Sequence, residues 1–129
     1  MIVVDSSVWI DFLNGHATPE VGRLSVLIGM EPLLVGDLIL LEVLQGLHSE
    51  ADAQRVEAAL RRFDVVPMLD PELAVIAAAY YRRLRALGVT VRKTIDLIIG
   101  TFCIARHHAL LTADRDFTPM AKHLRLTLI

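Results

Sequence analysis

The sequence predicts an α/β fold in which a central, mostly parallel sheet of four to five short strands carries helices on both faces. Segments with strand patterns alternate with segments with helix patterns along the chain. The expected strands are almost entirely apolar, as in parallel sheets buried on both faces. The chain has 129 residues, 54% hydrophobic and 22% charged, which suits one core. We therefore expect a three-layer α/β/α arrangement within a single domain over residues 1–129.

The first two elements are a strand and a short helix. Residues 2–5 are expected to form a buried strand, because they are apolar and β-branched up to the acid at position 5. Ser6 and Ser7 can cap a helix from Val8 to Leu13, which Asn14-Gly15 ends.

The next segment predicts a helix, a strand and a second helix. Residues 18–20 open a helix with proline at its first position, and this helix extends towards Gly29. Residues 33–35 form the second expected strand. Asp37 is expected to cap a helix that continues to about Leu47.

The middle of the chain repeats this alternation. Residues 50–63 have apolar side chains at helical spacing and predict an amphipathic helix. Residues 64–67 form the third expected strand. Residues 70–72 then start a long helix to Leu87, which Gly88 stops.

The C-terminal part predicts two helices and two strands. Thr94 is expected to cap a helix to about His107. Residues 109–112 form the fourth strand, residues 116–123 a short helix and residues 126–128 the last strand.

Composition excludes several classes of protein. No apolar run reaches the roughly 18 uncharged residues of a membrane span, and we see no secretion signal, so we expect a cytoplasmic protein. The single cysteine, Cys103, excludes an internal disulfide and a cysteine-based zinc site, and its apolar neighbours favour core packing. The net charge of −2 is unusual for a nucleic-acid binder, although the basic residues are clustered.

Four acidic residues stand within or beside apolar segments, where a lone carboxylate is costly to bury. Asp5 and Asp114 lie at or just beyond the ends of expected strands, Asp96 in the first turn of a helix, and Glu42 about one turn inside a helix. Ligands of parallel sheets bind at the carboxyl ends of the strands, so all four can meet at one edge. Carboxylate oxygens suit Mg²⁺ or Mn²⁺, and phosphodiester hydrolysis is the chemistry that such a site supports.

Each acid also has an ordinary structural interpretation. Asp5 can cap a helix, Asp114 can stabilise a turn, and Asp96 sits favourably in a first helical turn. Glu42 is the hardest to explain without a cation, because four apolar residues precede it and two follow it. We expect the four acids to act together because all four ordinary interpretations would otherwise have to hold at once.

In this order, the acids and their neighbours resemble the PIN-domain ribonucleases, and most closely the VapC-type toxins of bacterial toxin–antitoxin pairs. The matching stretches span nearly the whole chain: residues 4–10, 42–46, 94–100 and 111–117. The resemblance implies a PIN-like fold and a Mg²⁺- or Mn²⁺-dependent endoribonuclease, in which a metal-activated water attacks an RNA phosphodiester and leaves 5′-phosphate and 3′-hydroxyl ends.

The resemblance also implies roles for individual residues. Asp5, Glu42, Asp96 and Asp114 would form the catalytic metal site, with Asp116 as an auxiliary metal-binding acid. Ser6 and Thr112 would supply hydroxyl groups that orient carboxylates or water. The family further implies a homodimer and a cognate VapB-type antitoxin that places a basic side chain among the acids.

Clustered basic residues are candidates for phosphate contact. Arg82 and Arg85 share one face of an expected helix, where a solvated surface is the simpler interpretation. Arg92 and Lys93 precede Asp96 directly, which favours a phosphate role more strongly.

Two other functions fit part of the pattern. One is a binding module without catalysis, whose acidic groove grips a basic partner segment. The other is a phosphotransfer domain with Asp5 as nucleophile, which is weakened because no second acid follows two residues later. Mg²⁺-stimulated nuclease activity separates the leading hypothesis from the binding module.

Overall fold

The computed structural model, which describes residues 1–129, contains a five-stranded sheet in which every neighbouring pair of strands is parallel. The strand order is β3-β2-β1-β4-β5. The strands are β1 (Ile2–Val4), β2 (Leu33–Gly36), β3 (Asp64–Val66), β4 (Ala109–Leu111) and β5 (Thr127–Leu128). The predicted fold class, including the short apolar strands, is confirmed.

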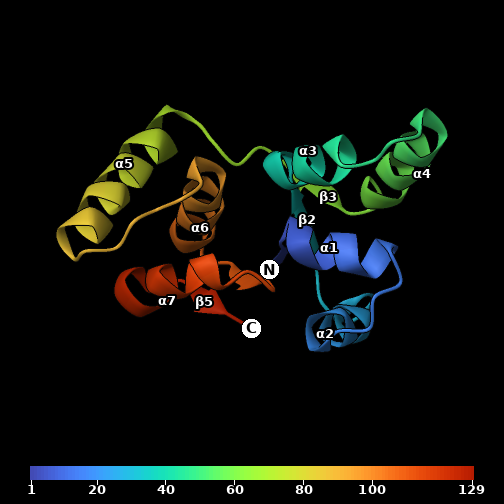
Figure 1. Cartoon of the computed structure of the whole chain (residues 1–129), viewed down its shortest axis with the longest axis horizontal. Helices are drawn as coiled ribbons and strands as arrows, with labels where there is room; N and C mark the ends of the chain where they lie inside the picture. Colours follow the sequence, from blue (N-terminus) through green and yellow to red (C-terminus); the bar gives the residue numbers. More distant parts are fainter.

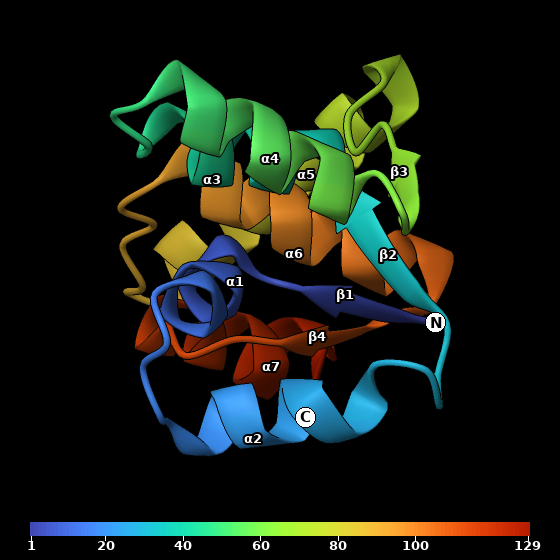
Figure 2. The ribbon, with the colours of Figure 1, turned by 90° about the vertical axis from the view of Figure 1, so that its right-hand side faces the viewer.

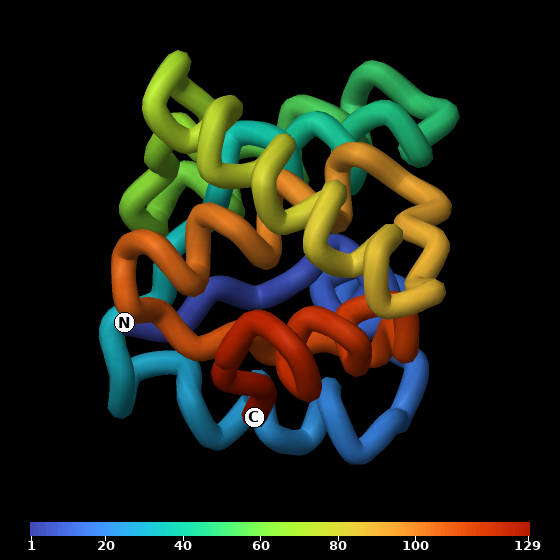
Figure 3. The backbone as a smooth tube through the Cα atoms, turned by 90° about the vertical axis from the view of Figure 1, so that its left-hand side faces the viewer, coloured from blue at the N-terminus to red at the C-terminus, as the bar shows by residue number.

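Helices cover both faces of this sheet. Figure 2 shows the face on which the first four helices lie, and Figure 3 shows the opposite face with the remaining helices. The helices are α1 (Ser6–Leu13), α2 (Pro19–Leu27), α3 (Asp37–Gln45), α4 (Glu50–Leu60), α5 (Pro71–Ala86), α6 (Thr94–Arg106) and α7 (Thr118–Leu124), with a short 3₁₀ helix, η1 (Arg115–Phe117), between β4 and α7. In Figure 1 the two groups of helices stand on either side of the sheet, giving the expected three layers.

The order of the strands fixes where a binding site can form. The chain runs outwards from β1 through β2 to β3, then crosses the sheet to β4 on the other side of β1. In open parallel sheets, ligands bind beyond the carboxyl ends of the strands at such a reversal of strand order, which lies here between β1 and β4. Val4 pairs with Leu111, and the Asp5 amide donates to the Leu111 carbonyl oxygen at 2.9 Å. The segments that leave β1 and β4 therefore start side by side.

The core lies on both faces of the sheet, as expected for strands with continuous apolar sequences. Val4 in β1, Val35 in β2 and Leu110 in β4 are fully buried. Trp9 of α1 packs against Phe63, with ring centroids 5.4 Å apart. Cys103 is a free thiol that is fully buried in α6, so its predicted packing role is confirmed. None of the helices is long and apolar enough to pass through a lipid bilayer.

Three predicted helix starts are shifted by one or two residues. Helix α1 begins at Ser6 itself, directly after Asp5. Asp37 and Thr94, which were expected to cap α3 and α6, each lie in the first turn, and the capping positions belong to the preceding residues. The Asp37 carboxylate instead accepts the amide of Met68 at 3.1 Å and so ties α3 to the segment after β3.

The last predicted helix is divided. Residues 116–123 were expected to form one helix, but the chain first makes the 3₁₀ turn of η1 and then begins α7 at Thr118. Pro119 in the first turn of α7 suits a helix start, because its missing N–H has no partner to lose there. This division moves Asp116 out of α7 and next to Asp114.

Candidate metal centre

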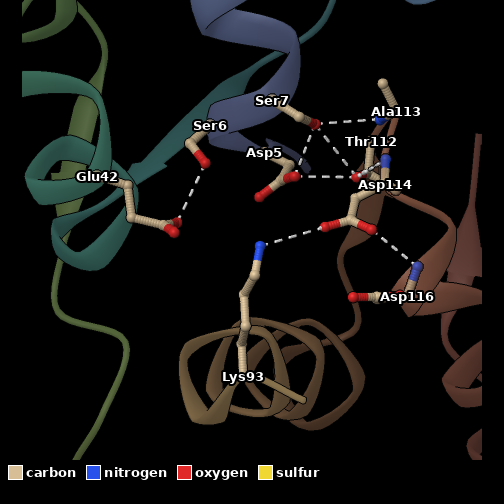
Figure 4. A network of polar contacts seen from close by, with 9 residues as sticks. All are labelled: Asp5, Ser6, Ser7, Glu42, Lys93, Thr112, Ala113, Asp114 and Asp116. Atoms are coloured by element: carbon tan, nitrogen blue, oxygen red, sulfur yellow. Dashed lines mark hydrogen bonds and ion pairs between the residues drawn. The ribbon is translucent and has the colours of Figure 1, made fainter. Parts of the chain in front are cut away.

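Asp5 is held at the end of β1 by two hydroxyl groups. Its side chain is 3% exposed, and Oδ2 accepts hydrogen bonds from Ser7 Oγ at 2.8 Å and from Thr112 Oγ1 at 3.0 Å (Figure 4). Burial raises the pKa of the Asp5 carboxyl, and the two hydroxyl donors act in the opposite direction. The hydroxyls are themselves fixed, because Ser7 accepts the amide of Ala113 and Thr112 accepts that of Asp114. This network joins α1 to the exit of β4.

Glu42 projects from the second turn of α3 and is only partly buried. Ser6 Oγ donates to its Oε1 at 3.1 Å, as Figure 4 shows. Burial raises the pKa of Glu42, and the charge of Asp5 adds to the rise. The expectation that Glu42 has the greatest need of a cation is wrong, because its exposure and its hydrogen bond to Ser6 both reduce the cost of its charge.

Asp96 carries the unsatisfied charge instead. It lies in the first turn of α6, is 7% exposed, and its Oδ2 is buried without any hydrogen-bond partner. Burial, followed by the charges of Asp5 and Asp114, raises the pKa of Asp96 to about 6. A buried oxygen without a partner is rare because it loses its hydration without compensation. The position therefore fits a ligand atom for a cation.

Asp114 and Asp116 lie beside Asp96. Asp114 follows β4, and its Oδ1 accepts the Asp116 amide at 2.9 Å, which caps η1. Carboxylate oxygens of Asp96, Asp114 and Asp116 all lie within 4.8 Å of one another, close enough to share one ion. Asp5 and Glu42 lie outside this group of three, although their charges raise the pKa of Asp96. Asp116, expected behind the other acids, thus belongs to the tightest group.

One cationic side chain of the chain forms an ion pair with these acids. Lys93, just before α6, extends towards them, and its ammonium nitrogen lies 3.9 Å from Asp114 Oδ2 (Figure 4). The positive charge of Lys93 opposes the rise in the pKa of Asp96 and of Glu42. One ammonium among five carboxylates leaves an excess of negative charge. The donors are all oxygen atoms, which is the set that Mg²⁺ and Mn²⁺ prefer.

The basic candidates Arg82 and Arg85, and the two adjacent histidines of the chain, lie away from the acids. Arg82 and Arg85 line a separate, largely apolar groove between α5 and α6, and the Arg85 guanidinium stacks over the Tyr81 ring at 5.7 Å. His107 and His108 follow the C-terminal end of α6, whereas Asp96 lies in its first turn. The acids therefore have no histidine beside them.

Ser7 is a hydroxyl beside the acids that was not expected from the sequence. Ser6 and Thr112 were the expected ones; Ser6 bonds to Glu42, and Asp5 is bonded by Ser7 as well as by Thr112. Neighbouring helical residues point in different directions, so two adjacent serines serve two different carboxylates.

Removal of the Ser7 and Thr112 hydroxyls, which hold Asp5 and of which Thr112 also accepts the amide of Asp114, is expected to weaken metal binding by about 10- to 100-fold. In the double variant Ser7→Ala, Thr112→Val the buried carboxylate loses both side-chain donors and is free to rotate. Isothermal titration calorimetry with Mn²⁺ measures the change in metal affinity. Ser25→Ala removes a hydroxyl from α2 that bonds only to the Val21 carbonyl oxygen, and serves as the control. An affinity within twofold of wild type would contradict the predicted orienting role.

The amino-acid sequence matches a known protein family over almost its whole length. The family model described as "PIN domain" matches residues 2–123. Two curated relatives, a VapC ribonuclease of Mycobacterium bovis and Ribonuclease VapC11 of Mycobacterium tuberculosis, are each 25% identical over 127 residues, covering 95% of this chain and 92% of the relative.

Solved structures show the same fold. VapBC2 from Rickettsia felis, bound to a promoter DNA fragment, superposes with a TM-score of 0.80 at 17% identity, covering 100% of this chain and 98% of the other. VapC20 from M. tuberculosis, described as a sarcin-ricin-loop-cleaving toxin, gives a TM-score of 0.68 at 18% identity, covering 92% and 93%. At such identities the superpositions support the fold alone.

Proposed function

The chain belongs to the PIN domain family, and on that premise we propose that it is a Mg²⁺- or Mn²⁺-dependent endoribonuclease that hydrolyses RNA phosphodiester bonds as a VapC-type toxin. The observation that carries the proposal is the unpartnered, buried Oδ2 of Asp96 beside the carboxylates of Asp114 and Asp116. Asp114 and Asp116 directly follow β4, at the edge of the sheet where parallel folds bind ligands. We further infer that residues 1–129 act as one nuclease domain in the cytoplasm.

The proposed roles follow from the positions of the side chains. Asp96, Asp114 and Asp116 would hold the ion, with Asp5 and Glu42 completing the acidic wall on the α1 and α3 side. When bound, the ion would polarise a phosphoryl oxygen and make a water more acidic. Thr112 and the two serines after Asp5 keep the carboxylates of Asp5 and Glu42 in one orientation, so that little reorganisation is needed when the substrate arrives.

A protein partner is the second part of the proposal. The structural neighbours include VapBC toxin–antitoxin complexes, and we infer that this chain also pairs with a VapB-type antitoxin and forms a homodimer. Exposed apolar side chains support the burial of surface by partners: Ile10 and Leu13 on α1 and Leu41 on α3 are 38%, 38% and 51% exposed. The acidic edge suits a basic side chain from the antitoxin, which would occupy the place of the ion and so inhibit cleavage.

The alternative function is a binding module that grips a basic segment without catalysis. One observation favours it, because the acids already attract an amine, that of Lys93. Such a module needs the negative charge of the acids but not a divalent ion. It therefore predicts partner binding without nuclease activity.

The deciding experiment uses the purified chain after any bound partner has been removed. Total cellular RNA is incubated with the chain in Mg²⁺, in Mn²⁺ and in EDTA, and the new ends are mapped. The proposal expects cleavage at discrete positions with either ion, 5′-phosphate and 3′-hydroxyl ends, and none in EDTA. Addition of a cognate VapB-type antitoxin should suppress cleavage. Intact RNA in both ions, with partner binding preserved, would favour the binding module.

A further inference from the structure

A cavity of about 210 Å³ adjoins the acidic cluster on the α6 side of the sheet. The segment between α5 and α6, the first turn of α6, and the η1–α7 segment form its walls. Asp96 and Asp116, two of the three clustered acids, belong to this wall. A molecule held at the acids therefore has the cavity directly beside it.

Three cationic side chains line the same cavity: Arg92, Lys93 and Arg115. Arg92 and Arg115 are exposed, and neither makes an ion pair or a side-chain hydrogen bond within the chain, although acids lie on the same wall. Guanidinium groups present several N–H donors in a plane, which matches the oxygens of a phosphate. Two such groups without internal partners are available to an external anion.

Lys93 is only loosely committed to the acids. Its contact with Asp114 is long, at 3.9 Å, and its side chain is 61% exposed. Exposed ion pairs of this kind are weak, so the ammonium can turn to another anion at little cost. An ion bound by the acids would also remove the attraction that now draws Lys93 to Asp114.

The start of α6 adds to the positive field. Its capping position is Lys93, and no side chain accepts a hydrogen bond from the first-turn amides. Unpartnered amides at a helix start carry a partial positive charge that favours anions. The cavity thus combines three side-chain charges with the positive end of a helix.

The volume of the cavity limits which ligands can fit. It is smaller than the roughly 300–1,000 Å³ clefts that enclose whole small-molecule ligands. A single phosphate group fits this description better than a complete nucleotide. The acids on the same wall repel a phosphate until a divalent ion neutralises them, so phosphate and ion are expected to bind together.

We propose that this cavity is a subsite for a backbone phosphate of the RNA next to the scissile one, held by Arg92, Arg115 and Lys93. The inference rests on the proposed nuclease function. It deepens that function by assigning how the RNA strand is positioned. The metal site and the cavity share a wall, so adjacent phosphates of one RNA strand can occupy both. Phosphate contacts of this kind fix register without reading the base.

The test measures binding of a short, fluorescein-labelled oligoribonucleotide of mixed sequence to the full chain, in Ca²⁺ in place of Mg²⁺ and at several salt concentrations. The double variant Arg92→Ala, Arg115→Ala is expected to bind about 10- to 100-fold more weakly. The slope of log Kd against log salt should fall by about 0.7 if one phosphate contact is lost. A variant with Arg92→Lys and Arg115→Ala keeps the charge at position 92 and should bind RNA more tightly than the double alanine variant.

The control is Arg23→Ala, Arg62→Ala, which removes two exposed arginines without ion pairs from α2 and from the end of α4. It should leave both the affinity and the salt slope unchanged. Equal affinity and slope in the Arg92, Arg115 double variant would overturn the subsite. The subsite would also be overturned if inorganic phosphate bound the chain without displacing RNA. The same holds if the double variant bound the antitoxin more weakly but bound RNA as tightly as wild type.

The subsite and the nuclease function fail separately. If the wild-type chain binds RNA but cleaves none in Mg²⁺ or Mn²⁺, the nuclease proposal fails while the salt slopes still decide the subsite. If the wild-type chain cleaves RNA and the double variant binds and cleaves it equally well, only the subsite fails.

Discussion

Replacement of Asp96 by asparagine is expected to lower ion-dependent RNA cleavage by more than about 100-fold. Loss of groups that merely orient metal ligands typically costs 10- to 100-fold, and Asp96 is itself an expected ligand. Its Oδ2 has no partner in the protein, so the carboxylate contributes charge to the site and no internal hydrogen bond that the fold depends on. Cleavage of a mapped RNA substrate in Mg²⁺ measures the effect.

The same substitution is expected to stabilise the ion-free protein at neutral pH. The folded chain holds the Asp96 proton with a pKa of about 6, against an ordinary value of 3.8. Since the folded state binds this proton more tightly, its stabilisation is complete below pH 3.8 and is lost as the pH rises through about 6. Asparagine carries no such charge, so the variant should melt at a higher temperature than wild type above pH 6.

The addition of Mg²⁺ should reverse the order of the two melting temperatures, so that wild type melts above the Asp96→Asn variant. The wild-type chain gains stability by binding the ion in its folded state, whereas the variant gains little. Asp11→Asn, which changes a partly exposed carboxylate of α1 outside the site, is the matched control and should follow wild type throughout. An Asp96→Asn variant that cleaves RNA at the wild-type rate would contradict the expected ligand role.

The sequence was sufficient to predict the fold because its signals are local and agree with one another. Short apolar strands alternate with helices that begin at proline or at capping residues, as in Thr18-Pro19 and Asp70-Pro71. Such a pattern leaves few arrangements other than a parallel sheet with two helical layers. The position of Asp5 and Asp114 at strand ends then placed both acids at one edge.

The finer geometry depends on contacts between distant segments, which the sequence does not encode locally. Glu42 follows four apolar residues, yet its helix turns it towards the open edge and towards Ser6, so it is only partly buried. Asp116 was expected to begin a helix. The 3₁₀ turn capped by Asp114 brings it into the tightest acidic group instead, and such turns have only weak sequence signals.

The cavity beside the acids was also beyond prediction in detail. Arg92 and Lys93 were recognisable because they precede Asp96 directly in the sequence. Arg115 belongs to η1, after β4, and only the packing of α6 against η1 brings it to the same wall. Nothing in the local pattern separates Arg115 from an ordinary exposed residue of a turn.

The Phe117→Ala variant is expected to lose about 3–5 kcal/mol of unfolding free energy. Phe117 is the last residue of η1 and is fully buried, so truncation removes its packing and leaves a cavity in the core. A domain of this kind has roughly 5–15 kcal/mol in total, so the loss is a large fraction. Urea unfolding followed by circular dichroism measures it. Val75→Ala, at a side chain that is 70% exposed on α5, should change stability by less than about 0.5 kcal/mol.

Phe117 is also expected to link the core to the metal centre. It follows Asp116 directly and anchors the turn that Asp114 caps, so its side chain fixes both carboxylates relative to Asp96. Phe117→Leu keeps an apolar anchor and should cost about 0.5–3 kcal/mol, which leaves the protein folded for ion titration. If Phe117→Leu loosens the η1 turn, the fully folded variant should bind Mn²⁺ more weakly than wild type does. Unchanged Mn²⁺ affinity together with lower stability would show that the turn holds its acids without the aromatic anchor, and would limit Phe117 to packing.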